Sequence, residues 1–206
     1  MGKAKTAVRA VLLDMDGTLW HNPVNWMALR EELGLGVDHL PISYHLARLP
    51  PADRAAGERR LREAEAQGVS QGRPVPRARE LVEFLVARGV KCALVTNNSR
   101  ESVDGVLARC PLPLDAVFSR EDIPLKPDPE AFLLPLRKLG VGPEEACVIG
   151  DSHLDLLAAH RAGIGRVILV APQGWMRALF PPGARFQEVR DLWEAREVLA
   201  ELLTGA

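Results

Sequence analysis

The chain has 206 residues, of which 47% are hydrophobic and 26% are charged. This composition predicts one or at most two compact globular domains and excludes a fibre, a disordered tail and a membrane protein. The 26 basic residues nearly balance the 27 acidic ones, and the formal net charge of -1 excludes a global field that would attract nucleic acid or an anionic membrane.

Short apolar runs alternate with amphipathic patterns along most of the chain. The runs have the composition of buried strands, and the patterns between them repeat at helical spacing. Together they predict an α/β fold, a doubly wound, Rossmann-like parallel sheet of about five strands with helices on both faces. The expected strands are 8–14, 92–97, 116–118, 147–151 and 167–171. The expected helices are 100–109, 152–161 and 191–203, one from Ala78 that ends before Gly89, and one after Asp128-Pro129 that ends at Gly140.

Between the first and second expected strands lies a segment without a strand pattern. Two helices that begin near prolines are expected in it, at about residues 22–34 and 51–67, and further prolines mark the return to the α/β pattern. We interpret the segment as an inserted helical module. The predicted organisation is an α/β core formed by residues 1–19 and 77–206 and a small helical cap formed by residues 20–76.

Acidic and basic residues alternate in the second helix of this module. Such a mixture favours a solvated helix face over a basic binding surface. The residues concerned are Arg59, Arg60 and Arg62 with Glu58, Glu63 and Glu65.

Carboxylates follow two of the expected strands at the point where each strand ends. Asp14 and Asp16 follow the first strand and precede Gly17, while Asp151 and Asp155 follow the fourth and share one helix face. The carboxyl ends of parallel strands gather at one edge of an open sheet, where ligands bind. Carboxylates that meet there repel one another unless a cation lies among them, and oxygen ligands without His or Cys favour Mg2+ over zinc.

Groups that can bind an anion follow the other strands. Thr96 and Asn97 end the second strand, and Lys126 lies in the loop after the third. Carboxylates, a divalent cation, a lysine and small hydrogen-bond donors together predict a site for phosphoryl chemistry.

The order of these motifs resembles the haloacid dehalogenase superfamily, and within it the magnesium-dependent phosphatases with a small helical cap, such as phosphoglycolate phosphatase. The motifs are D-x-D-G-T from Asp14, T-N-N-S from Thr96, K-P at Lys126 and G-D-S-x-x-D from Gly150, and the resemblance covers about residues 8–171. Each motif is weak alone, but four in this order are specific. The resemblance implies hydrolysis of a small phosphorylated metabolite.

The resemblance also implies a two-step reaction. Asp14 is the implied nucleophile, which forms an aspartyl-phosphate, and Asp16 is the implied general acid and then general base. Thr96 and Lys126 are implied to hold the phosphoryl oxygens, and Asn97 to add a backbone donor. The dehalogenases of the superfamily lack the second aspartate and need no metal, so Asp16 favours ester hydrolysis.

The metal site and the substrate contacts are implied in the same way. Asp151 is implied to bind Mg2+ directly and Asp155 to support it, so that the full set of metal residues is Asp14, Asp16, Asp151 and Asp155. Arg100 and His153 directly follow two of the motifs and are candidates for contact with the substrate. Segments 19–22 and 72–76 are candidate hinges for opening of the cap.

Two alternatives to a phosphatase stay open. A phosphomutase on the same core would return the phosphoryl group to the substrate, and a catalytically idle binding module would carry the fold alone. The cap has no readable substrate code, so a sugar phosphate, phosphoglycolate and a nucleotide monophosphate are all candidates. The oligomeric state is not predicted.

The cysteines and the apolar runs predict a cytoplasmic protein. Cys92, Cys110 and Cys147 are odd in number, lie in apolar segments and form no C-x-x-C motif, which is typical of reduced thiols. No apolar run approaches the ~20 residues that a bilayer requires. The first apolar stretch is broken at Asp14, which disfavours a secretory signal.

Overall fold

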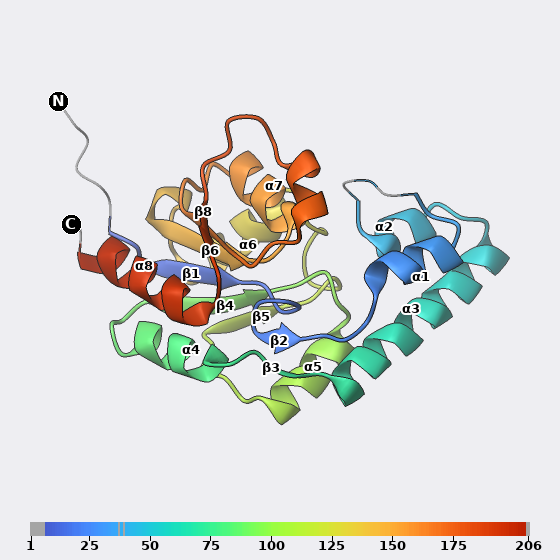
Figure 1. The fold of residues 1–206 in the computed structure, drawn as a ribbon, viewed down its shortest axis with the longest axis horizontal. Helices are drawn as coiled ribbons and strands as arrows, with labels where there is room; N and C mark the ends of the chain where they lie inside the picture. The colour runs from blue at the N-terminus through green and yellow to red at the C-terminus, as the bar shows by residue number, and fades with distance from the viewer. Residues whose placement is uncertain (1–6, 37, 39, 205–206) are drawn as a thin grey trace.

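The computed structural model describes residues 7–36, 38 and 40–204. Its centre is a six-stranded sheet of order β5-β4-β1-β6-β7-β8 with helices on both faces (Figure 1). Every neighbouring pair in this sheet is parallel. The strands are β1 Ala10–Leu13, β4 Lys91–Val95, β5 Ala116–Phe118, β6 Ala146–Gly150, β7 Val167–Val170 and β8 Gln187–Val189.

The predicted fold class is confirmed, and each of the five expected strands is present within a few residues of its expected bounds. The expectation of about five strands was low by one, because β8 was not recognised. Gln187 and Glu188 in β8 are exposed and only Val189 is buried, so this edge strand has no apolar run. An edge strand needs fewer apolar side chains than a central strand that is covered on both faces.

The side chains of β1 show how the sheet divides the core. Val11 and Leu13 belong to one apolar cluster, and Ala10 and Leu12 belong to another. Successive residues of a strand point to opposite faces, so both faces of β1 are buried.

The helices of the core cover these two faces. Phe132 and Leu136 of α6 and Leu156 of α7 pack in the cluster that contains Leu12. The other face is covered by α4, α5 and α8, with Leu81 among the buried residues. The helices are α4 Ala78–Val86, α5 Arg100–Arg109, α6 Glu130–Leu139, α7 His153–Arg161 and α8 Leu192–Thr204, with 3-10 turns η1 Pro143–Glu145 and η2 Gly174–Leu179. None of the helices in the described part of the chain combines the length and apolar composition needed to cross a bilayer.

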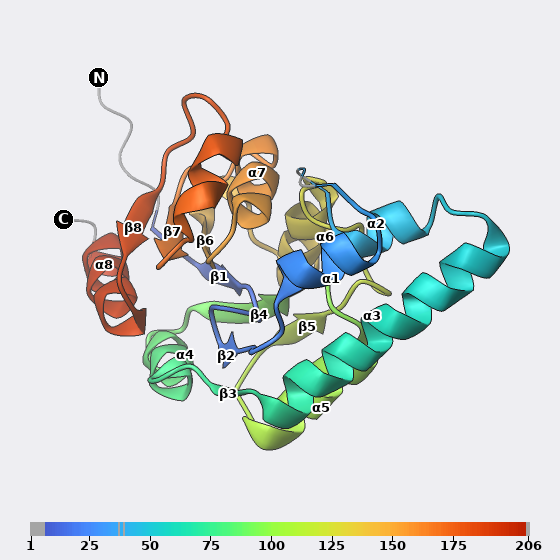
Figure 2. The same cartoon turned by 45° about the vertical axis from the view of Figure 1, so that its right-hand side comes forward.

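The segment between β1 and α4 forms a helical lobe beside the carboxyl edge of the sheet. Figure 2 shows α1 and α2 lying along the much longer α3. Their apolar residues form a cluster of their own. The elements are β2 Trp20–His21, α1 Trp26–Glu32, α2 Ile42–Leu46, α3 Pro51–Gln71 and β3 Arg73–Pro74.

The lobe differs from the expectation at several ends. α1 begins at Trp26 because Asn25 caps it, with its Oδ1 accepting a hydrogen bond of 3.0 Å from the backbone N–H of Ala28. α3 continues to Gln71, and the short α2 was not expected. The two candidate hinge segments lie side by side, because β2 pairs with β3 in an antiparallel arrangement.

Candidate active site

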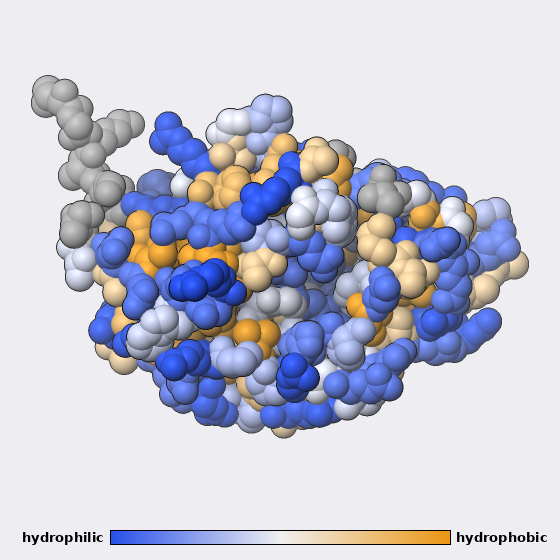
Figure 3. Space-filling model, in the orientation of Figure 1, coloured by the Kyte–Doolittle hydropathy of each residue, from blue (hydrophilic) through white to orange (hydrophobic). Residues whose placement is uncertain are grey.

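All of the predicted site residues except Asp155 and Arg100 line one cleft of about 570 Å³ between the carboxyl edge of the sheet and the helical lobe. Asp14 follows β1, Thr96 follows β4 and Asp151 follows β6, and these three strands are neighbours. Figure 3 shows this side of the molecule, on which hydrophilic residues predominate and apolar residues reach the surface on both the core and the lobe. The sheet topology therefore brings together side chains from distant parts of the chain.

Lys126 lies buried at the base of the cleft, with 3% of its surface exposed. Its Nζ is 2.5 Å from Oδ1 of Asp14, 2.6 Å from Oδ1 of Asp155 and 3.0 Å from the backbone carbonyl of Val95. The Asn97 side chain fixes the Lys126 backbone, accepting from its N–H at 2.8 Å and donating to its carbonyl at 3.0 Å. The loop after β5 is thus tied to the end of β4.

Three carboxylates gather around this lysine. One oxygen from each of Asp14, Asp151 and Asp155 lies within 4.8 Å of the others. Burial raises the pKa of Asp14 to about 7, although Lys126 opposes the shift. Burial and the nearby charge of Asp14 raise the pKa of Asp151 well above its ordinary value. The cluster is therefore short of positive charge when only Lys126 faces it.

Asp155 is the most enclosed member of the cluster and has no exposed surface. Its Oδ1 accepts from Lys126. Its Oδ2 accepts from the hydroxyl of Ser152 at 2.6 Å and from the backbone N–H of Ser152 at 3.2 Å. Both oxygens of Asp155 already accept hydrogen bonds. Asp155 therefore supports the cluster by holding Lys126 and Ser152 in position.

Asp16 has different surroundings from Asp14. Its Oδ2 accepts hydrogen bonds from Nδ2 of Asn22 at 3.0 Å and Nδ2 of Asn98 at 2.9 Å. Its Oδ1 is buried and has no partner among the described residues. Burial raises the pKa of Asp16 to about 6, although the two amides oppose the shift. The Asp16 side chain does not belong to the three-carboxylate cluster.

Gly17 makes the close approach of the two acidic motifs possible. Its φ of +77° is a backbone conformation that residues other than glycine rarely adopt. A Cβ atom at this position would lie 2.0 Å from Oδ2 of Asp151. The backbone can therefore turn directly after Asp16 while Asp151 lies against it.

Comparison with known proteins identifies the family. A family model described as haloacid dehalogenase-like hydrolase matches residues 8–163, which is most of the chain.

The chain belongs to the haloacid dehalogenase-like hydrolases.

Relatives in this family support the assignment. The chain is 30% identical over 169 residues to the uncharacterized hydrolase YOR131C of Saccharomyces cerevisiae, covering 79% of this chain and 77% of that protein. It is 28% identical over 191 residues to a phosphoglycolate phosphatase of Rhodospirillum rubrum, covering 78% of this chain and 79% of the relative. It is 29% identical over 181 residues to hexitol phosphatase A of Escherichia coli, covering 80% and 84%.

Solved structures of the haloacid dehalogenase-like hydrolases share the fold. A haloacid dehalogenase family hydrolase from Deinococcus radiodurans, solved with bound phosphate and sodium, matches with a TM-score of 0.67 and 25% identity, covering 97% of each chain. A haloacid dehalogenase-like hydrolase from Bacteroides fragilis matches with a TM-score of 0.73 and 19% identity, covering 91% of this chain and 99% of the other.

The two candidates for substrate contact, His153 and Arg100, have different surroundings in this hydrolase. His153 lines the cleft, and its ring packs edge-on against Trp175 with centroids 5.8 Å apart. Arg100 is not among the residues that line the cleft. Its guanidinium forms an ion pair with Asp122 and donates to the Val117 carbonyl at 3.3 Å. Acceptors on and after β5 thus hold Arg100 away from the cleft.

Sequence reasoning missed a buried bridge between the lobe and the loops that follow β4 and β5. Glu65 of α3 is 3% exposed, accepts a hydrogen bond of 2.6 Å from the Ser99 hydroxyl and forms an ion pair with Arg120. The expectation of a solvated face is therefore wrong for Glu65. The alternating charges describe the rest of α3 correctly, but they do not reveal which turn packs against the core.

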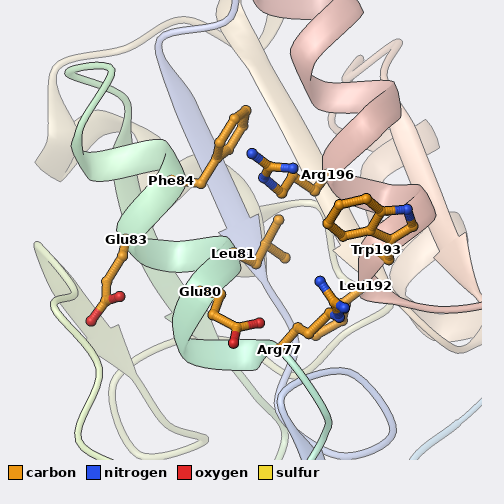
Figure 4. Close-up of a pocket in the computed structure, with 8 residues that line it drawn as sticks. All are labelled: Arg77, Glu80, Leu81, Glu83, Phe84, Leu192, Trp193 and Arg196. Atoms are coloured by element: carbon orange, nitrogen blue, oxygen red, sulfur yellow. The ribbon is translucent and has the colours of Figure 1, made fainter.

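A second hollow, of about 510 Å³, lies between α4 and α8 (Figure 4). Figure 4 shows Trp193 between Arg77 and Arg196, and the two guanidinium carbons lie 4.4 and 5.3 Å from its ring centroids. None of the strand-end motif residues lines it. Its arginines pack against an aromatic ring, and we assign it no catalytic role.

Proposed function

We propose that the chain is a magnesium-dependent phosphatase that hydrolyses a small phosphate monoester through an aspartyl-phosphate on Asp14. The observation that carries this proposal is the cluster of Asp14, Asp151 and Asp155. One carboxylate oxygen of each lies within 4.8 Å of the others, and the buried Nζ of Lys126 contacts Asp14 and Asp155. Membership of the hydrolase family and the relatives named as phosphatases support the same reaction class.

The residues of the cluster fit a hard divalent cation. All three are aspartates, so the side-chain donors are carboxylate oxygens, which Mg2+ prefers. Burial raises the pKa of Asp14 and Asp151, and a cation bound beside them would favour their ionised forms. Asp14 and Asp151 would hold the ion, with Asp155 close behind. When bound, Mg2+ would offset the negative charge that the carboxylates and the phosphoryl group bring together.

The side chains of Asp14 and Lys126 begin the reaction. An Oδ atom of Asp14 attacks phosphorus, and the bond from phosphorus to the leaving oxygen breaks. Lys126 holds a phosphoryl oxygen, and Thr96, which lines the cleft, adds a donor. The Asn97 amide acts indirectly, because it holds the Lys126 backbone in place.

Asp16 acts as the general acid and then as the general base. Burial raises the pKa of Asp16 to about 6, which makes the protonated form that can donate to the leaving oxygen more populated than in an ordinary aspartate. In the second step Asp16 takes a proton from the water that attacks the aspartyl-phosphate. Release of inorganic phosphate then restores Asp14.

The organisation and location of the protein are part of the same proposal. A core of residues 1–19 and 77–206 with a cap of residues 20–76 is supported by the separate apolar cluster of the lobe. A reducing compartment, the cytoplasm, is supported by the three cysteines, all of which are buried and free.

The deciding experiment measures inorganic phosphate release from a panel of phosphorylated metabolites, with Mg2+ or with a chelator. We expect Mg2+-dependent release, and we expect Asp14→Asn to lower it at least about a thousandfold while circular dichroism stays unchanged. Asp53→Asn, at an exposed position in the first turn of α3, is the matched control and should keep full activity. Wild-type activity in Asp14→Asn would contradict the nucleophile, and return of phosphate to the substrate would indicate a mutase.

A further inference from the structure

The basic residues around the cleft are already matched by acids. Of the described residues that line it, Arg30, Arg120 and Lys126 are the lysines and arginines. Lys126 faces Asp14 and Asp155 in the catalytic cluster. The other two lie farther out, where the leaving group of a substrate would extend.

Arg30 and Arg120 are each already paired with an acid. Arg30 is 2.9 Å from Oδ1 of Asp38, and it also donates to the backbone carbonyls of Gly36 at 2.9 Å and Leu40 at 2.8 Å. Arg120 forms an ion pair with the buried Glu65. A second anionic group on the substrate would compete with these acids for the guanidinium groups and would lie close to their carboxylates. The outer cleft therefore suits an uncharged leaving group.

The outer cleft also has apolar walls on both sides. Trp26 and Met27 of α1 and Leu61 of α3 line it from the lobe, and Trp175 and Met176 of η2 line it from the core. Trp26 and Met27 are half-buried, and Trp175 is 39% exposed, although large apolar side chains are usually covered. A ligand between these walls would remove apolar surface from water on two sides.

The Trp175 ring is held in place for such a contact. Its Nε1 donates to Oε1 of Gln173 at 2.8 Å, so its polar atom is already satisfied. Its ring also packs edge-on against the His153 ring. The exposed remainder of the indole is therefore an oriented apolar surface at the mouth of the cleft.

We propose that the substrate is a phosphate monoester whose leaving group is uncharged and largely apolar, an alkyl or aryl body that packs between Trp26 and Trp175. This inference rests on the proposed phosphatase activity and refines its substrate class. It separates this chain from an enzyme for a substrate with a second anion, such as phosphoglycolate. The cleft of about 570 Å³ has room for a leaving group of several carbons.

The test is a series of n-alkyl phosphates, from ethyl through butyl to hexyl phosphate, assayed with Mg2+ for phosphate release. The leaving alcohols have nearly equal acidity, so chain length changes contact with the protein and leaves the bond-breaking chemistry alike. We expect kcat/KM to rise roughly fourfold per buried methylene, and phosphoglycolate to be a poorer substrate than ethyl phosphate. A flat series, or phosphoglycolate as the best substrate, would overturn the inference.

Variants connect the chain-length effect to the two tryptophans. Trp26→Ala and Trp175→Ala should each reduce the gain from ethyl to hexyl phosphate at least threefold, and Trp175→Phe should restore part of it. Trp193→Ala on α8 removes a tryptophan of similar exposure, 42%, that does not line this cleft, and it should keep the wild-type series. An unchanged series in both cleft variants would contradict the inference.

The proposed function has a separate control. Acetyl phosphate and p-nitrophenyl phosphate carry good leaving groups and need little binding energy from the outer cleft. If neither these nor the alkyl phosphates are hydrolysed with Mg2+, both the proposed phosphatase and this refinement fail. If they are hydrolysed by wild type but not by Asp14→Asn, and chain length has no effect, only the substrate class is wrong.

Discussion

Asp14 and Asp16 are two residues apart in the chain, yet the fold gives them different hydrogen-bond partners. Asp14 faces the ammonium group of Lys126, while Asp16 faces the side-chain amides of Asn22 and Asn98. An ammonium favours an ionised carboxylate strongly, whereas neutral amides favour it less. In the metal-free protein, burial raises the pKa of Asp14 to about 7 and that of Asp16 to about 6. Since a nucleophile must be ionised and a general acid must carry a proton, the proposed roles require a bound cation that lowers the pKa of Asp14.

The raised pKa of Asp16 makes a prediction about the stability of the metal-free protein. The pKa is about 6 in the folded state against 3.8 ordinarily, so the folded state binds the proton more tightly than the unfolded state does. The resulting stabilisation is complete below pH 3.8 and is lost as the pH rises through about 6. We therefore expect the free energy of unfolding to fall by about 3 kcal/mol over this window because of Asp16.

Urea denaturation in the presence of a chelator at a series of pH values measures this effect. Asp16→Asn removes the titrating group, so the difference in free energy of unfolding between wild type and variant isolates its contribution. We expect the variant to show the shallower decline between pH 4 and pH 7. Parallel curves for the two proteins would contradict the raised pKa of Asp16.

At the scale of elements, the sequence predicts best where burial is complete. β1 and β6 are buried at every residue, so their apolar runs are unmistakable. β8 has two exposed residues out of three, and α2 has only five residues, too few for a helical period to be distinct. The inserted module could be predicted because it interrupts the alternation of strands and helices.

The candidate site, like the fold, could be predicted only in part. Parallel strands end together, so the strand-end motifs sufficed to predict that Asp14, Asp151 and Lys126 meet, while their catalytic roles stay predictions. The bridge from Glu65 to Ser99 joins residues 34 positions apart in the chain and depends on how α3 docks. Local patterns do not contain that information, since the charges around Glu65 resemble those of an exposed helix.

The carboxyl end of α3 is held by a side chain from the core. Nη1 of Arg109 on α5 donates to the backbone carbonyls of Val69 at 2.6 Å and Ser70 at 2.7 Å, and Nη2 donates to that of Gly72 at 3.2 Å. The last carbonyls of a helix lack partners within the helix, and a cation is favourable near them. Arg109 thus fastens the lobe to the sheet domain at one end of α3.

Removal of this cation should loosen the junction. We expect Arg109→Ala to lower the free energy of unfolding by about 1–2 kcal/mol, because the carbonyls lose charged donors at a partly exposed site. Urea denaturation measures the change. Arg59→Ala on the exposed surface of α3 is the matched control and should change stability by less than about 0.5 kcal/mol. Equal effects of the two variants would contradict this role of Arg109.

At the scale of the whole molecule, the sheet and the lobe enclose a site that concentrates negative charge. Folding brings Asp14, Asp151 and Asp155 together with one lysine, and burial together with repulsion from the neighbouring carboxylates raises the pKa of Asp151. A cation that binds this arrangement and not the unfolded chain should stabilise the fold.

Thermal unfolding with increasing Mg2+ tests this linkage. Above the dissociation constant, each tenfold increase in Mg2+ should add about 1.4 kcal/mol, or about 3–6 °C in Tm. Asp151→Asn should raise Tm in the chelator, since it relieves repulsion, and should lose most of the response to Mg2+. Glu201→Gln on the exposed side of α8 should respond like wild type. An undiminished Mg2+ response in Asp151→Asn would show that the ion binds elsewhere.

The pairing of β2 with β3 has a consequence for how the molecule can change over evolution. Trp20 lies opposite Pro74 and His21 opposite Arg73, so the chain leaves the sheet and returns to it at adjoining points. The entropy of closing an inserted segment depends only weakly on its length. A segment whose two ends already lie side by side can therefore be lengthened, shortened or exchanged at little cost to the stability of the core. Through this paired neck, segments of different length or sequence could replace the lobe while the residues at the strand ends stay the same. Substrate selectivity could then change without a change in those residues.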